Sequence, residues 1–243
     1  MRLAATAVFF SCCVVMPGAQ RLDSARNAID AYRMAIQVAQ QSPSGGRLEA
    51  AFDAIGPLRE ALMRSPGGRE STLASLSEQE FAALGRELPG LIVNREEILF
   101  VQPDVVFFRR LAARGDRADR TFFAALASTY PDSVWPVYLD QQTDYSGCTR
   151  FGSGTLVSSY VTWAAVRRQY PKRYEEASAG HLGDIVKELT ESTCACGDRA
   201  SVEQELTEFR RRVGASDVRT RVEARRAAVR RDRADFRFSC KSG

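Results

Sequence analysis

The chain has 243 residues, of which 44% are hydrophobic and 26% are charged, and its formal net charge is +4. This ordinary globular composition excludes a disordered, collagen-like or multi-span membrane protein. The single histidine, His181, excludes two-histidine metal sites such as H-E-x-x-H, and the sequence has no G-K-[ST] phosphate loop.

Residues 1–20 are predicted to be a secretory signal peptide, which leaves residues 21–243 as a single helical domain. Arg2 precedes an apolar run from Leu3 to Met16, and a positive start before a short apolar run is typical of such signals. The alternative is the stretch Phe9-Phe10-Ser11-Cys12, which resembles a weak lipobox, the site where bacterial lipoproteins are cut and acylated. A lipid anchor on Cys12 would then be the only expected membrane attachment.

Helical periodicity dominates the first half of the mature chain. We expect a helix capped by Asp23 or Ser24, a second helix broken at Gly56-Pro57, and a third that begins with the capping box Ser77-x-x-Glu80. Residues 66–76 are a candidate sub-boundary. The apolar stretch 91–101 is predicted to be a short buried helix, although it is the most strand-like segment of the chain. Further helices are expected over 104–112 and 119–130.

The longest gap in this periodicity runs from Asp140 to Gly154, and we expect it to be an ordered loop without secondary structure. Such loops are often functional, and this one offers Asp144, Tyr145, Ser146 and Arg150. Trp135-Pro136-x-Tyr138 precedes the loop, as aromatic residues do at many recognition surfaces. Helices should follow over 155–170, over 181–190, from a cap at Ser201 to Val213, and then to about Arg233.

The weak catalytic candidates are His181, Asp184, Asp144 and Ser146. His181, Asp184 and Glu188 share one face of a helix that we expect to begin near Gly180, and a histidine with acids can do general acid–base chemistry. Asp144 and Ser146 are the other candidates, and a nucleophilic Ser146 would need His181 as its base. An ordinary solvated histidine is the simpler interpretation, so no catalytic set is assigned.

Removal of the signal leaves four cysteines, Cys148, Cys194, Cys196 and Cys240. Cys194 and Cys196 are too close in sequence for an unstrained mutual bridge, so Cys148 and Cys240 should each pair with one of them. The four-cysteine spacing does not fit structural zinc, which usually needs two C-x(2–4)-C knuckles. We therefore expect two disulfides, which form in exported proteins, and no metal or cofactor.

Positive charge gathers near the C-terminus, where residues 210–233 hold ten arginines and three acids, a net charge of +7. Arg219, Arg226, Arg230 and Arg233 fall on one helical face. This face is predicted either to be solvated or to bind an anionic envelope surface or an acidic protein. Nucleic acid is not expected, since the arginines lack interleaved aromatic residues.

Together these patterns predict an all-α fold, an irregular multi-helix bundle or short superhelix stapled by two disulfides. We expect an exported, periplasmic or lipid-anchored protein that binds a partner rather than an enzyme. Inhibitor, immunity-type and envelope-assembly roles fit, and binding would use Arg219, Arg226, Arg230, Arg233, Tyr145 and Arg150. The alternative is a secreted hydrolase that acts on envelope material.

Overall fold

The computed structural model describes residues 19–65, 70–96, 98–131, 134–143, 146–232 and 234–240. Several predicted features lie outside these residues: residues 1–18 of the signal peptide, Cys12, Asp144, Tyr145 and Arg233. Within the described ranges, none of the helices combines the length and the hydropathy that crossing a bilayer demands.

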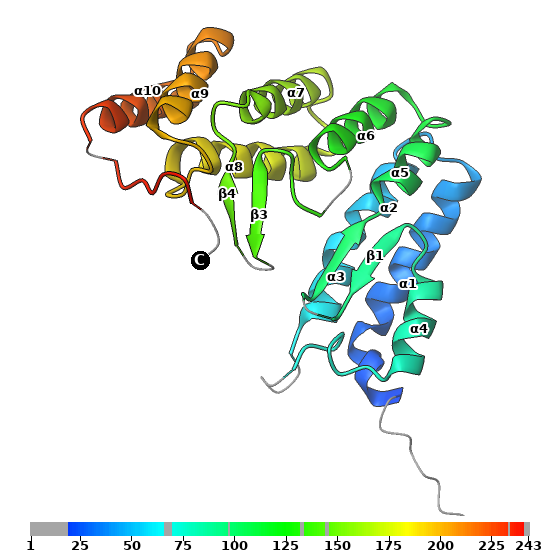
Figure 1. Cartoon of the computed structure of the whole chain (residues 1–243). Helices are drawn as coiled ribbons and strands as arrows, with labels where there is room; N and C mark the ends of the chain where they lie inside the picture. The colour runs from blue at the N-terminus through cyan, green and yellow to red at the C-terminus, as the bar shows by residue number, and fades with distance from the viewer. Residues whose placement is uncertain are drawn as a thin grey trace, which may run out of the picture.

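The N-terminal half is a group of helices around the long helix α1 (Figure 1). Its elements are α1 (Ala19–Gln41), α2 (Arg47–Asp53), α3 (Ile55–Met63), α4 (Glu78–Glu87), β1 (Leu91–Asn94), β2 (Phe100–Pro103) and α5 (Val105–Ala112). The predicted break near Pro57 is confirmed, and it falls at Ala54, which places Pro57 in the first turn of α3. The capping box is also confirmed, with mutual bonds between Ser77 and Glu80.

The start of α1 and the stretch 91–101 depart from prediction. Helix α1 already includes Ala19, so Asp23 and Ser24 are not at its start. Strands β1 and β2 pair antiparallel, with Leu91 opposite Pro103 and Asn94 opposite Phe100. The predicted helix is wrong because β-branched residues in LIVN favour an extended backbone, and a short apolar run has no periodicity that would oppose it. Within the candidate sub-boundary at residues 66–76, Leu73 and Leu76 are buried in the core.

Among its described residues, the C-terminal half contains five helices and a second hairpin (Figure 1). Its elements are α6 (Arg117–Thr129), β3 (Leu139–Thr143), β4 (Ser146–Thr149), α7 (Thr155–Gln169), α8 (Glu175–Glu191), α9 (Arg199–Arg212) and α10 (Asp217–Arg230). Helices α6 and α7 end at Tyr130 and Tyr170, as their following prolines predict. The prediction of an all-α fold therefore holds for most of the described chain and fails at two short hairpins.

Three local predictions in this half are wrong. The segment 140–154 is not free of secondary structure, because β3 pairs with β4. Helix α8 begins at Glu175, so His181 lies inside the helix and not at its first turn. Asp198, rather than Ser201, caps α9, since its carboxylate accepts from the Ser201 backbone N–H at 2.8 Å.

An aromatic cluster joins the two halves. The ring of Phe52 on α2 makes edge contacts with Phe108, Phe122, Phe123 and Tyr174, at centroid distances of 5.1 to 6.2 Å. Arg173 lies beside this cluster and pairs with Glu49 on α2, with Asp116 at 2.7 Å and with the fully buried Asp119 at 2.8 Å. The halves are thus joined through α2, α5, α6 and the turn before α8.

Candidate functional site

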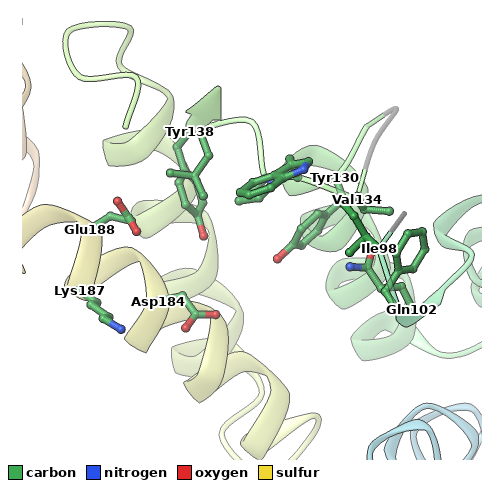
Figure 2. Close-up of a pocket in the computed structure, with 12 residues that line it drawn as sticks. Ile98, Gln102, Tyr130, Val134, Tyr138, Asp184, Lys187 and Glu188 are labelled. Carbon is green, nitrogen blue, oxygen red and sulfur yellow. The ribbon is translucent and has the colours of Figure 1, made fainter. Parts of the chain in front are cut away.

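A cleft of about 410 Å³ opens between the two halves, on the side of β2 and α8. Figure 2 shows Ile98 and Gln102 on one wall, Tyr138, Asp184, Lys187 and Glu188 on the other, and Tyr130 and Val134 between them. Its full lining is Ile98, Phe100, Gln102, Tyr130, Val134, Trp135, Pro136, Tyr138, Leu139, Asp184, Lys187 and Glu188. We call it the inter-half cleft.

The first wall is one face of the N-terminal hairpin. Ile98, Phe100 and Gln102 alternate along the chain into and through β2, and alternate side chains of a strand point to the same face. A helix over 91–101 would not place these three side chains on one face, so they were not among the predicted site residues. The period-two spacing of 98, 100 and 102 was the signal that would have found them.

The floor of the cleft is the linker between α6 and β3. It begins where Tyr130 ends α6, and the Val137 N–H then donates to the Thr129 carbonyl at 2.9 Å. On its other side the Arg150 N–H donates to the Tyr138 carbonyl, also at 2.9 Å. These backbone bonds fix the aromatic segment that the sequence had singled out.

The second wall is helix α8. Asp184, Lys187 and Glu188 are spaced three and four residues apart, which places them on one face of the helix. The Thr149 hydroxyl on β4 donates to the Glu188 carboxylate at 2.5 Å and lies 2.6 Å from the Ser192 hydroxyl. Thr149 is buried, so it holds the Glu188 side chain in one orientation.

Two disulfides hold β4 in that position. Cys148 pairs with Cys196 and Cys194 pairs with Cys240, which confirms that each outer cysteine bonds to one member of the close pair. The Thr149 N–H donates to the Cys194 carbonyl, and the Cys196 N–H donates to the Thr149 carbonyl, both at 3.0 Å. The disulfide cluster and the cleft are therefore linked through Thr149.

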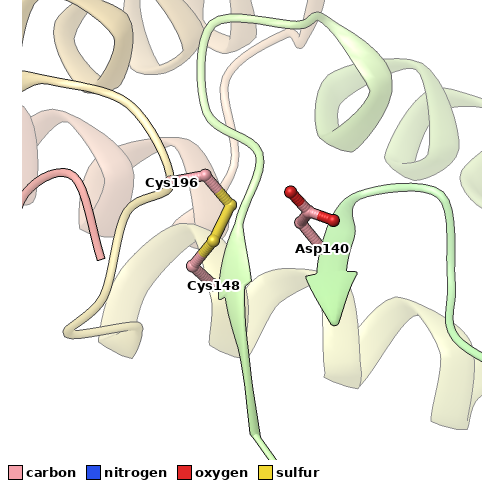
Figure 3. Close-up of side chains that lie close together, drawn as sticks. All are labelled: Asp140, Cys148 and Cys196. Carbon is pink, nitrogen blue, oxygen red and sulfur yellow. A yellow bond between two sulfur atoms is a disulfide. The ribbon is translucent and has the colours of Figure 1, made fainter. Parts of the chain in front are cut away.

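Asp140 lies beside the disulfide between Cys148 and Cys196 (Figure 3). Its carboxylate and the two sulfurs lie within 4.8 Å of one another, a grouping that resembles part of a metal site. A cysteine ligates a metal as its thiolate, and the sulfurs of an intact disulfide are not thiolates. This cluster can therefore act only as a cross-link while the bridge is oxidised.

The α8 end of the cleft carries negative potential. Burial raises the pKa of Asp184, and the positive charge of Lys187 opposes that rise. Burial, and then the charge of Asp184, raise the pKa of Tyr130 to about 12. The pKa of Tyr138 is raised mainly by burial and also by Tyr130, Asp184 and Glu188. The hydroxyls of both tyrosines thus face the two carboxylates and stay protonated.

His181 lies behind the cleft. Its ring stacks on Trp163 at a centroid distance of 4.2 Å and lies 5.9 Å from the ring of Tyr130, which itself lines the cleft. Burial lowers the pKa of His181 to about 4, so it is a neutral packing group at pH 7. The expectation of an ordinary solvated histidine is wrong, because α8 presents this residue to α7.

We expect this burial to make stability depend on pH. An unfolded histidine titrates near 6.5, so between about pH 6.5 and pH 4 the unfolded chain binds the extra proton. Above pH 6.5 the neutral His181 does not lower the free energy of unfolding. As the pH drops to 4, its burial lowers that free energy by roughly 3 kcal/mol. In His181→Phe, which keeps a ring against Trp163, urea unfolding should lose this dependence. Other titrating groups, such as Asp53, whose pKa burial raises to about 6, are present in both proteins, so their contributions cancel in the difference. Equal pH slopes would contradict the assignment.

Of the other predicted catalytic residues, Asp144 lies outside the described residues and Asp184 lies on the same helix as His181. The Ser146 hydroxyl lies 2.7 Å from that of Thr143 within the β3–β4 hairpin, and the contacts of the described residues do not join it to His181. The guanidinium of Arg150 donates to the Val137 carbonyl at 3.4 Å, so this residue supports the cleft floor. Of the weak catalytic candidates, Asp184 lines the inter-half cleft.

The predicted arginine face lies along α10, toward α9. Arg219 donates to Glu223 at 3.1 Å, Arg226 to the Thr207 hydroxyl at 2.9 Å, and Arg230 to Glu203 at 3.0 Å. These three guanidinium groups thus bind acceptors of the same chain. Binding of an anionic partner by this face stays a prediction.

Comparison of the chain with protein-family models, with curated proteins and with solved structures finds no match.

Proposed function

We propose that this is an exported protein that binds a partner, and that the inter-half cleft receives a segment of that partner. The observation that carries the proposal is the cleft itself: aromatic and apolar side chains from both halves surround a few polar groups. Binding sites are commonly concave, mostly apolar and placed between structural units. A volume of about 410 Å³ fits a few side chains of an inserted segment rather than a whole domain.

The composition of the lining supports binding to a protein. Trp135, Tyr130 and Tyr138 provide large rings with polar tips, and tryptophan and tyrosine are enriched where partners contribute most to affinity. Backbone bonds hold their linker at both ends. A site that is already ordered loses less conformational entropy when it binds.

The disulfides support export. Such bridges form and persist in oxidising compartments and are rare in the cytosol. Here one bridge ties β4 to the turn at 194–196, and the other ties that turn to the C-terminal segment. A periplasmic protein, or one anchored through a lipid on Cys12, fits this chemistry. Inhibition, immunity and envelope assembly are the roles in which such a protein would bind another.

A secreted hydrolase is the second candidate. One observation favours it: burial raises the pKa of Asp184, and Glu188 lies one helical turn away in the same cleft. Two carboxylates in one site, one of them with a raised pKa, can act as acid and base in glycoside hydrolysis. Release of soluble fragments from peptidoglycan by the purified protein, abolished in Asp184→Asn, would favour this candidate over the binding protein.

The binding proposal is tested by capture on the immobilised, oxidised protein from an envelope extract. Trp135→Ala should reduce the specifically captured partner at least tenfold, because it removes the largest ring of the cleft. Ile92→Ala is the matched control, since Ile92 is an apolar residue that is 46% exposed on β1 and does not line the cleft. Equal capture by the wild type and Trp135→Ala would refute the proposal.

A further inference from the structure

We propose that the α8 end of the inter-half cleft is a subsite for an arginine side chain of the bound segment, with Asp184 and Glu188 as its acceptors. This inference rests on the proposed function, because it names the chemistry of the segment that the cleft receives. It is carried by the combination of two carboxylates and several aromatic faces in one concave site.

The charge of the cleft wall favours a cationic ligand. Asp184 and Glu188 bring two negative charges to the cleft wall, and Lys187 is the one cation among the described lining residues. The charge of Arg225, outside the lining, acts on both Glu188 and Glu191. A neutral ligand would leave the remaining negative charge desolvated when the cleft is covered, which is costly. A cationic group would neutralise it at the same moment.

The arrangement of the acceptors and rings favours a planar cation. The two acceptors are one helical turn apart on α8, and Figure 2 shows the hydroxyl-bearing edge of Tyr138 on the same side as both carboxylates. A guanidinium is planar, carries five donors and stacks on aromatic rings, whereas an ammonium is a compact point charge. A planar group with several donors suits two acceptors beside the rings of Tyr138, Tyr130 and Trp135.

The chain binds its own guanidinium groups in the same way. Arg173 donates to the carboxylate of Asp119 at 2.8 Å, and its guanidinium carbon lies 5.6 Å from the centre of the Tyr174 ring. That site also combines an acidic residue with a tyrosine whose hydroxyl donates to the same carboxylate at 2.7 Å. The inter-half cleft offers a second set of these groups with an open side.

The carboxylate of Glu188 is held in place by its neighbours. Glu188 is held by the buried Thr149, whose backbone is fixed between Cys194 and Cys196. The acceptor is therefore set before a ligand arrives. Thr149 is a positioning residue in this account, because its hydroxyl acts on the ligand only through Glu188.

The test compares two probes, the peptide Ac-Gly-Phe-Arg-Gly-NH2 and the same peptide with citrulline, which keeps the shape of arginine but not its charge. Isothermal titration at low salt should show at least tenfold tighter binding of the arginine peptide, and the difference should shrink as salt is added. The double variant Asp184→Asn/Glu188→Gln should reduce the preference to below about threefold. Thr149→Val should reduce it partly, and Lys187→Gln should increase it, because it removes the competing cation.

The outcomes separate this inference from the proposed function. Equal affinity of the two peptides, or binding of neither, overturns the arginine subsite. So does a preference that survives in the double variant, with circular dichroism that shows the variant folded. Any of these results can occur while Trp135→Ala still loses capture of the partner. The cleft then binds a partner of different chemistry, and only the subsite is wrong. Capture unchanged in Trp135→Ala refutes the proposed function itself.

Discussion

Replacement of Glu205 by alanine should lower the free energy of unfolding by roughly 3 to 5 kcal/mol. The Glu205 side chain is buried, and its carboxylate accepts from the backbone N–H groups of Gly152, Gly154 and Val157 at 2.8 to 3.0 Å. These amides lie at the start of helix α7, whose N-cap residue, Gly154, has no side chain that could cap it. The carboxylate of α9 therefore caps α7 from outside, and its loss leaves buried donors unpaired at the positive end of a helix.

The glycines of this loop explain how the carboxylate approaches three amides. Gly152 and Gly154 have φ angles of 83° and 76°, values that disfavour other residues. A Cβ at Gly152 would also meet Ser201 at 2.9 Å. The loop thus closes around Glu205 only with glycine at these places.

Glu203→Gln is the matched control for Glu205→Ala in urea unfolding. Glu203 lies on the same helix and pairs with Arg230 at the surface, where its side chain is 28% exposed. An ion pair of this kind contributes about 0 to 1 kcal/mol. If the two variants lose similar stability, Glu205 is not the external cap of α7.

Replacement of Arg173 by methionine should also cost roughly 3 to 5 kcal/mol at pH 7, because it leaves three acids without their shared cation. Asp119 is fully buried, and Glu49 and Asp116 have side-chain exposures of 17% and 34%. Burial raises the pKa of Asp119 even with Arg173 present. In the variant these acids can be relieved by protonation, so the loss should be smaller at pH 5 than at pH 7.

Lys172→Met provides the comparison, since this exposed neighbour carries the same charge one residue earlier. Its cost should stay within about 0.5 kcal/mol, as for other surface substitutions. Because Arg173 joins α2 to α6, tryptic cleavage between the halves should also be faster in Arg173→Met. An equal loss in the two variants, or no pH dependence of the difference, would show that this cluster does not join the halves.

Local signals in the sequence predicted much of the fold. The box at Ser77 and the prolines after Tyr130 and Tyr170 act within one turn of a helix, so neighbouring residues suffice to place those ends. The disulfide pairing could be narrowed because Cys194 and Cys196 are too close to bridge. Each of these inferences needs only residues near one another in the chain.

Tertiary pairing decided what the sequence could not settle. In 91–94 and 100–103, β-branched residues and the period-two spacing of 98, 100 and 102 favour strands, but a short apolar run alone does not exclude a helix. The pairing of Leu91 with Pro103 decides for the strand. In 139–149, the polar strands are stabilised by the backbone ladder and the disulfide turn rather than by apolar alternation. Both failures concern pairing between segments, although at 91–94 the residue preferences also favoured a strand.

The candidate site was predicted in part for the same reason. Trp135, Tyr138, Asp184 and Glu188 stood out from the sequence as aromatic and acidic groups, and all four line the cleft. Their convergence with Phe100 and Gln102 depends on how the two halves are joined. The clustered arginines of α10 were predicted as a candidate binding face, yet Arg226 and Arg230 bind acceptors on α9.

The most direct test of the account is photo-cross-linking of the oxidised protein with its partner in envelope extract. Benzoylphenylalanine would be placed at position 135 in the cleft and, in a second protein, at the exposed position 231 at the end of α10. We expect a discrete cross-linked species from position 135, lost when unlabelled wild-type protein is added in excess, and none from position 231. A species formed only from position 231 would contradict the account, because it would place the partner on the arginine helix and leave the cleft empty.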